Sequence, residues 1–208
     1  MGDQLILFTR YPEPGRVKTR LIPALGEQGA ADLHRKLTDT CLGCLLDICK
    51  DTDTGITVFF SGGNKQQMYR WLPDMSMVRQ EGADLGERMI AAFSHVRAKG
   101  GQHILLVGSD CPELSPAIIR QGFQYLLTHD LVLGTAHDGG YYLVGISADF
   151  APASLEPLMI DMEWGTGDVL SMTLARIRRA GYSCGLLPRL HDIDRPEDLA
   201  YFEIVHQG

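Results

Sequence analysis

The sequence predicts an α/β fold: a three-layer α/β/α sandwich built on a mostly parallel, mixed sheet. Strand-like apolar runs alternate with helical segments of ten or more residues, as in chains whose parallel strands are joined by helices. The run at 103–108 is almost continuously apolar, which is typical of a central strand buried on both faces. The segments 130–135 and 141–146 are separated by a connection too short for a crossover helix, so we expect them to be antiparallel.

The remaining elements follow from apolar periodicity and from residues that start or stop a helix. The segment 26–50 has apolar side chains at spacings of three and four residues. Ser115 followed by Pro116 is a typical helix start with serine as the cap, and Gly181 is a typical stop. Strands are expected at 4–9, 56–60, 75–79, 103–108, 130–135, 141–146 and 182–187. Helices are expected at 26–50, 64–72, 84–99, from 115 onward, at 166–180 and at 196–205.

Length and composition favour one domain spanning residues 1–208. The net charge of −7 argues against general nucleic-acid binding, which usually involves a basic domain. No run approaches the ~18 apolar residues that a membrane span needs. The first residues lack the basic and apolar regions of a secretory leader. We therefore expect a cytoplasmic protein with no nucleic-acid partner and no membrane span.

The five cysteines do not indicate a disulfide framework. Cys41 and Cys44 form a C-x-x-C spelling, but no second pair accompanies them and they do not stand between a strand and a helix. Both lie on the apolar stripe of the helix at 26–50. We expect them to pack as small hydrophobic side chains.

The segment after the first strand concentrates positive charge. It is shaped by Gly15 and the prolines before it, and it holds one acid, Glu13. Its cations are Arg10, Arg16, Lys18 and Arg20. Cations on a loop at the carboxyl end of a strand suit a phosphate-binding site, and α/β sheets bind ligands at this edge. The alternative is an ordinary solvated surface.

Asp110 is the strongest single candidate for chemistry. It directly follows the buried strand at 103–108, and Pro112 keeps that strand from continuing. A carboxylate at this place points into the crevice of an α/β sheet and could hold Mg²⁺ or Mn²⁺ against phosphate oxygens. The alternative is an aspartate that caps a helix or a turn.

A second candidate site is the connection 137–142. Gly139 and Gly140 allow a close backbone approach or a positive φ, and Asp138 beside them could accept hydrogen bonds from substrate hydroxyl groups. A plain hairpin turn explains the Asp-Gly pair equally well.

A third candidate is the turn that enters the helix at 84–99. This turn contains Gln80, Gly82 and Gly86, and its free backbone N–H groups could meet a base edge or a phosphate. Asp84 is expected to cap the helix with Glu87 as its partner, with ligand contact as an additional role.

The fourth candidate is the segment 191–199. Asp192 and Asp194 are two residues apart, so in an extended chain they point the same way. They could provide a metal ligand in addition to Asp110. Alternatively, Asp194 caps the last helix while Asp192 contacts a ligand.

Taken in order, these segments resemble the nucleotide-diphospho-sugar transferase fold of the GT-A type. More narrowly, the chain is similar to a bacterial family of glycosyltransferase-like proteins that was formerly held as a domain of unknown function. That family is in turn similar to 2-phospholactate guanylyltransferase and to molybdenum-cofactor nucleotidyltransferases. The stretches that carry the resemblance are 8–21, 84–89, 108–112, 138–142 and 192–199.

The resemblance implies a role for each segment. The loop cations Arg10, Arg16, Lys18 and Arg20 would hold nucleotide phosphates, and the turn 80–86 would lie near the base. Asp110 would take the place of the metal-binding aspartate. The acceptor or sugar pocket would be lined by Asp138, Gly139, Gly140 and Tyr141. One departure is that many glycosyltransferases of this fold have Asp-x-Asp at the metal position, whereas here Cys111 and Pro112 follow Asp110.

Three functions remain open from the sequence. The first is glycosyl transfer from a nucleotide-diphospho-sugar to a small-molecule acceptor, with Asp110, Lys18 and Asp138 as the residues that carry the reaction. The second is nucleotidyl transfer from a nucleoside triphosphate to a phosphorylated small molecule, with release of pyrophosphate. The third is nucleotide binding without catalysis. In the first two, a divalent ion and fixed cations would stabilise the charge on the leaving phosphate.

Overall fold

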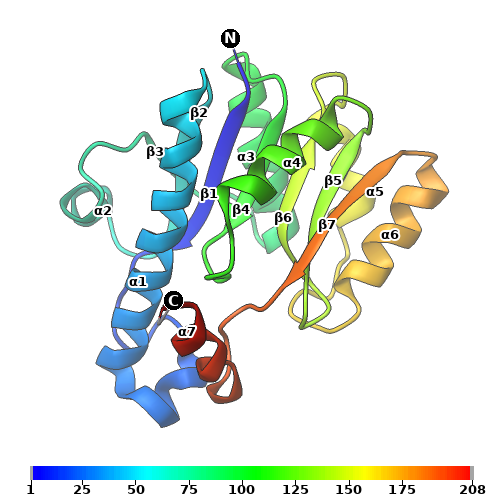
Figure 1. The fold of residues 1–208 in the computed structure, drawn as a ribbon. Coiled ribbons are helices and arrows are strands. Elements are labelled where there is room, and N and C mark those ends of the chain that lie inside the picture. The colour runs from blue at the N-terminus through cyan, green and yellow to red at the C-terminus, as the bar shows by residue number, and fades with distance from the viewer. Residues whose placement is uncertain (1, 207–208) are drawn as a thin grey trace.

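The computed structural model describes residues 2–206, and its centre is a seven-stranded sheet in the order β3-β2-β1-β4-β6-β5-β7 (Figure 1). The strands are β1 (Gln4–Arg10), β2 (Gly55–Ser61), β3 (Met77–Arg79), β4 (Ile104–Gly108), β5 (Leu131–Ala136), β6 (Tyr141–Ile146) and β7 (Cys184–Leu190). In the described sheet, β6 alone is antiparallel to its neighbours β4 and β5, while β7 is parallel to β5. The predicted mixed sheet and its antiparallel pair are confirmed.

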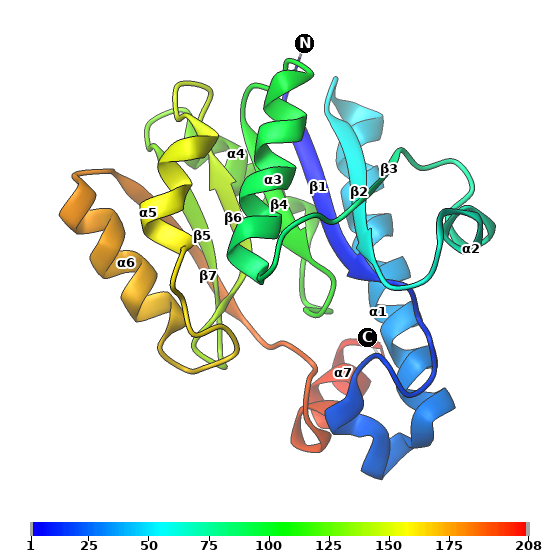
Figure 2. The same cartoon turned by 180° about the vertical axis from the view of Figure 1, so that it is seen from behind.

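Helices cover both faces of the sheet. They are α1 (Ile22–Asp51), α2 (Lys65–Trp71), α3 (Leu85–Ala98), α4 (Pro116–Leu126), α5 (Glu156–Met159), α6 (Val169–Ala180) and α7 (Leu199–His206). Figure 2 shows α3, α5 and α6 in front of the sheet with α1 and α4 behind it. The fold is therefore the three-layer sandwich that the sequence predicts.

The central strand divides the core into two apolar layers. Leu105 and Val107 of β4 pack in the layer under α1 and α4, whereas Ile104 and Leu106 pack in the layer under α3. All four side chains are at most 4% exposed. Burial on both faces explains why this strand is continuously apolar and does not alternate with polar residues.

The observed element ends differ from the predicted ones where a local residue overrides the periodicity. Helix α1 begins at Ile22, ahead of the predicted start, and is interrupted at Gly26, whose φ of 70° is not helical. Strand β7 runs through Pro188, although the prediction ended at residue 187. Proline is tolerated there because β7 is an edge strand of the sheet.

The predicted helix starts at Asp84 and Ser115 are confirmed, and Arg195 rather than Asp194 occupies the cap position of the last helical segment. Asp84 caps α3, since its side chain accepts a hydrogen bond from the Glu87 amide, but Glu87 bonds the amide of Ala83 and not that of Asp84. Ser115 precedes α4 without a side-chain cap bond. At the start of the last helical segment, Asp198 accepts the backbone amides, and Asp194 pairs with an arginine.

The cysteines are free thiols, and Cys41 is buried in the core as predicted. Burial raises the pKa of the Cys41 thiol well above its usual value and raises that of Cys44 to about 11. Such thiols stay protonated and unreactive at neutral pH. In residues 2–206, none of the helices is long and apolar enough to cross a membrane.

The register of the antiparallel strand predicts the effect of one glycine substitution. Gly145 of β6 lies between Leu105 and Val132, and a methyl group added to it would meet both side chains, the second at 2.7 Å. We expect Gly145→Ala to lower the free energy of unfolding by about 1–3 kcal/mol through overpacking. Urea denaturation measures this change.

Gly43→Ala is the matched control. Gly43 is an exposed position in α1 with nothing within 4 Å of an added methyl group. Alanine should stabilise the helix there by up to about 1 kcal/mol. Equal stability of the Gly145→Ala variant and the unchanged protein would contradict the register described above.

Candidate active site

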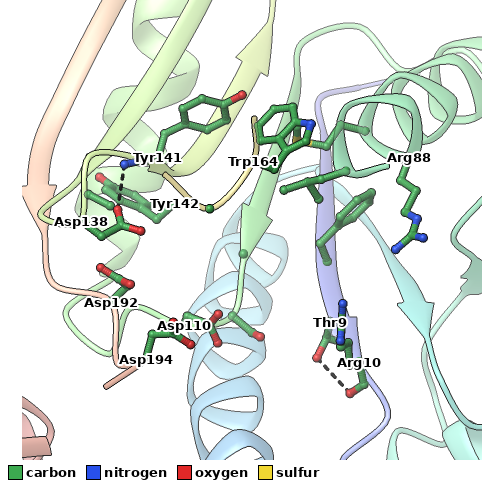
Figure 3. Close-up of a pocket in the computed structure, with 18 of the residues that line it drawn as sticks. Thr9, Arg10, Arg88, Asp110, Asp138, Tyr141, Tyr142, Trp164, Asp192 and Asp194 are labelled. Atoms are coloured by element: carbon green, nitrogen blue, oxygen red, sulfur yellow. Dashed lines mark hydrogen bonds between the residues drawn. The ribbon is translucent and has the colours of Figure 1, made fainter. Parts of the chain in front are cut away.

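A cleft of about 740 Å³ opens at the carboxyl ends of β1 and β4. Strand β1 has β2 on one side and β4 on the other, a point where α/β sheets commonly bind ligands. Figure 3 shows the carboxylates of Asp110, Asp192 and Asp194 on one side of the cleft and Arg10 and Arg88 on the other. The cleft is lined by residues from 8–10, 16–20, 80–89, 106–111, 136–144, 164–169 and 192–194, together with His34 and Ser61.

The ion pair between Lys18 and Asp110 brings the first loop to the end of the central strand. The Lys18 Nζ atom lies 2.8 Å from Asp110 Oδ1, and the Lys18 side chain is only 4% exposed. Lys18 has a left-handed backbone with φ of 47°, which is unfavourable for a residue with a side chain. Two segments that the sequence predicts to share a crevice therefore do so.

The charge of Asp110 is stabilised despite its location. Burial opposes ionisation, but the ammonium of Lys18 together with nearby His34 and Arg10 outweighs it, so the pKa of Asp110 lies below its usual value. The carboxylate is thus ionised at neutral pH and available as an oxygen ligand.

The other loop cations also have acidic partners, with one exception. Arg20 lies 2.6 Å from Asp194, and Arg16 lies 3.4 Å from Glu13 on the exposed rim. Asp194 is also 3.9 Å from Lys18 Nζ. Arg10 has no ion pair with any side chain that the structure describes, those of residues 2–202. Among the cations of this loop, Arg10 can therefore bind an anion without first breaking an ion pair with a carboxylate.

Asp192 lies in the most acidic part of the cleft. Burial, followed by the charges of Asp138, Asp198 and Asp110, raises its pKa to about 6. A carboxylate whose pKa is raised by neighbouring acids lies where a cation would be favoured. Asp138 and Asp192 thus lie near each other although they come from different loops.

The hairpin between β5 and β6 has the form of a tight turn packed against another loop. Asp138 accepts a hydrogen bond from the Gly140 amide at 2.8 Å. Gly139 has a φ of +89°, and a side chain there would collide with the carbonyl of Gly167. Asp138, Gly140 and Tyr141 line the cleft, whereas Gly139 does not. Its glycine is explained by packing, and its contact with a ligand stays a prediction.

In the turn before α3, the side chains rather than the glycines reach the cleft. The Gln80 amide donates to the carbonyls of Thr9 and Phe59, at 3.3 and 3.0 Å. Only its oxygen is left for a ligand. Gln80 and Asp84 line the cleft. Among the glycines predicted to bind nucleotide, Gly15, Gly82 and Gly86 do not line it.

Several lining residues were not found from the sequence. Arg88 comes from the second turn of α3, where its spacing from Asp84 could have placed it on the same helix face. Trp164 lies in the loop before α6 and its ring meets that of Tyr141 edge-on, with centroids 6.2 Å apart. His34 projects from α1, and nothing in the local sequence distinguishes it from a core residue.

The acidic side of the cleft fits a metal site in which the protein supplies some of the ligands, and water and the substrate supply the others. Among the side chains described, those of residues 2–202, no three histidines, cysteines or acids are close enough to hold an ion by themselves. Mg²⁺ commonly takes one or two carboxylates and completes its shell with water and substrate phosphates. Asp110 and Asp192, on neighbouring segments of one cleft, provide that donor set.

Comparisons with known proteins agree with this architecture. The family model "Uncharacterized protein conserved in bacteria (DUF2064)" matches residues 45–166. A protein from Desulfovibrio desulfuricans G20, provisionally named a nucleotide-diphospho-sugar transferase, is 33% identical with a TM-score of 0.84, over 94% of this chain and 84% of that one. No curated protein sequence matches the chain.

Two more distant structures share the fold. One is 4-diphosphocytidyl-2C-methyl-D-erythritol synthase from Anaerococcus prevotii DSM 20548, with 10% identity, coverage of 99% and 97%, and a TM-score of 0.63. The other is glucosyl-3-phosphoglycerate synthase from Mycobacterium tuberculosis, in complex with Mn²⁺, UDP and phosphoglyceric acid. It has 13% identity, coverage of 99% and 75%, and a TM-score of 0.57.

The fold, the cleft and the 33% identical relative place this chain in the nucleotide-diphospho-sugar transferase superfamily, and the two more distant structures share its fold. The resemblance seen in the sequence is thereby confirmed. Since the family model covers more than half of its length, the chain belongs to the DUF2064 family.

The raised pKa of Asp192 predicts a pH-dependent stability. Its folded pKa of about 6 exceeds the usual 3.8, so the ionised form is disfavoured in the fold and stability is lost as pH rises from about 4 through 6. The shift alone corresponds to up to ~3 kcal/mol. Solvent screening at this half-buried group reduces that to about 1 kcal/mol. Asp192→Asn should therefore be more stable by about 1 kcal/mol at pH 8 and by less at pH 5.

Chemical denaturation in EDTA at the two pH values measures this difference. Asp194→Asn is the matched control, because it removes an ion pair with Arg20 and should give no stabilisation. If the Asp192→Asn variant is no more stable than the unchanged protein at pH 8, the folded state does not disfavour the ionised Asp192 carboxylate.

Proposed function

We propose that this protein transfers a glycosyl group from a nucleotide-diphospho-sugar to a small-molecule acceptor, with Mg²⁺ or Mn²⁺ at the diphosphate. The Lys18–Asp110 ion pair carries this proposal, because it brings a phosphate-binding cation and a metal-binding carboxylate to one point of the cleft. The name of the relative that is 33% identical agrees with it.

The charge balance of the cleft favours a diphosphate over a triphosphate. The sequence suggests an excess of positive charge on the first loop. In the structure, Lys18 faces Asp110, Arg20 faces Asp194 and Arg16 faces Glu13. The less negative ligand needs less uncompensated positive charge, so a nucleoside diphosphate donor fits better.

The cations of the loop would bind and stabilise the leaving group. Arg10, which pairs with no carboxylate among the described side chains, and Lys18 both line the cleft and would contact the diphosphate oxygens. Fixed positive charges stabilise the negative charge that develops there as the bond to the sugar breaks. A divalent ion held by Asp110 and Asp192 would add Lewis-acid stabilisation of the same oxygens.

Asp138 is the proposed general base. An acceptor hydroxyl oxygen forms the new bond to the anomeric carbon, the bond from that carbon to the diphosphate breaks, and the hydroxyl proton passes to the Asp138 carboxylate. Asp138 is exposed at the cleft on the hairpin opposite the first loop. This position supports the proposal, because a general base must lie within hydrogen-bond reach of the acceptor hydroxyl.

Nucleotidyl transfer is the second candidate, and the single aspartate after β4 favours it. Cys111 and Pro112 follow Asp110 where many glycosyltransferases of this fold have a second aspartate. In that reaction, a phosphate oxygen of the second substrate attacks the α-phosphorus of a nucleoside triphosphate, and pyrophosphate leaves.

A product screen decides between these functions. Nucleotide-sugars and nucleoside triphosphates are offered with Mg²⁺ or Mn²⁺ and a set of hydroxylated and phosphorylated acceptors. We expect release of a nucleoside diphosphate. Release of pyrophosphate would replace the proposal with nucleotidyl transfer, and nucleotide binding with neither product would indicate a non-catalytic protein.

Asp110→Asn tests the site within the same assay. Losing the charge that opposes Lys18 and holds the ion should lower kcat/KM by about 10²–10³-fold. Asp149→Asn is the control, because Asp149 is an exposed carboxylate beyond the end of β6, at the other edge of the sheet. Equal activity of the two variants would remove Asp110 from the mechanism.

A further inference from the structure

The carboxyl end of β1 loses a strand neighbour where the cleft begins. β1 pairs with β2 as far as Arg10, but its pairing with β4 ends at Phe8. The Tyr11 amide bonds Ser61 of β2, so the carbonyl of Arg10, one residue earlier, faces the side that β4 has left and needs another donor. Gln80 donates to the Thr9 carbonyl at 3.3 Å, and the ring of His34 lies 3.1 Å from the Arg10 carbonyl.

His34 belongs to a buried polar network between α1 and β1. Its Nε2 atom is 3.4 Å from Thr9 Oγ1, which is 3.0 Å from Thr38 Oγ1. Thr38 in turn donates to the His34 carbonyl at 3.0 Å. His34 is 5% exposed, and Thr9 and Thr38 are at most 4% exposed. Such a network orders its members because an unsatisfied buried group would be costly.

The hydrogen bond between His34 Nε2 and the Arg10 carbonyl can run in only one direction. A carbonyl oxygen only accepts hydrogen bonds, so Nε2 of His34 must carry the hydrogen that faces Arg10. Burial lowers the pKa of His34, which keeps the ring neutral at pH 7. A glutamine side chain can place an amide N–H where the Nε2–H of this neutral ring lies. The asparagine side chain is too short to do so.

The hydrogen bond from His34 bears on function because its acceptor is the backbone of Arg10, which lines the cleft. Arg10 is the loop cation without a carboxylate partner among the described side chains, and it lies at the strand end that His34 holds (Figure 3). We propose that His34 is a positioning residue, which fixes the Arg10 backbone and so aims the Arg10 guanidinium at the phosphate of a bound nucleotide. The nature of the ligand rests on the proposed function, whereas the hydrogen bond does not.

A matched pair of variants tests the proposal. Titration calorimetry with ADP, CDP, GDP and UDP, each with Mg²⁺, measures Kd for His34→Gln and His34→Asn. We expect the asparagine variant to weaken the tightest nucleotide about tenfold, the effect of one lost hydrogen bond, and the glutamine variant to stay within about threefold.

A double-variant cycle identifies the route of the effect. Arg10→Met should weaken binding at least as much as His34→Asn, and the two changes combined should weaken it no further than Arg10→Met alone. Additive losses, or equal affinities of the asparagine and glutamine variants, would overturn the positioning role.

Hydrogen exchange separates this inference from the proposed function. The asparagine variant should exchange backbone amides at 11–21 faster than the glutamine variant, with α4 unchanged in both. If no diphosphate binds the unchanged protein, the proposed glycosyl transfer fails as the function, and the exchange difference alone decides whether His34 holds the strand end. Equal exchange in both variants would overturn that role.

Discussion

The ion pair between Lys18 and Asp110 connects the first loop to the strand at the centre of the sheet, and the arrangement of the cleft depends on it. The lysine side chain is almost fully buried and its backbone is left-handed, two features that each cost free energy. They are offset only if both charges stay together. Asp194, which reaches toward Lys18 and binds Arg20, extends the pair to the segment after β7. Three parts of the chain that are distant in sequence are thereby held at one edge of the sheet.

This arrangement explains how an acidic chain can provide a site for an anionic ligand. Most cations of the first loop are balanced by carboxylates, so the cleft does not present a strong positive field. Under the proposed function, phosphate would be met by Arg10 and Arg88, which pair with no carboxylate among the described side chains, and by a cation at Asp110 and Asp192. Coupling between nucleotide and metal is a natural consequence, since each neutralises charge that the other would otherwise face.

Much of this could be predicted from the sequence, because strand ends determine where loops meet. The position of Asp110 after a buried apolar run, and of Lys18 after the first strand, was sufficient to place them in one crevice. Pairings across long separations were not predictable: Arg20 and Asp194 are 174 residues apart, and no local pattern connects them. The roles of glycines were also ambiguous. Gly139 is required by the approach of Gly167, a contact that depends on the path of a loop about thirty residues later.

The reversed direction of β6 has a consequence for how members of this family can diverge. Because β6 runs against β4, its first residue lies at the same edge as the last residues of β1 and β4, and the turn carrying Asp138 hangs over the cleft from a hairpin. A hairpin tip can lengthen, shorten or change its side chains while the paired strands keep their register. In this protein the tip also packs against the loop at Gly167 and accepts a hydrogen bond from Leu170, so the half of the cleft opposite the first loop can change only when both loops change together.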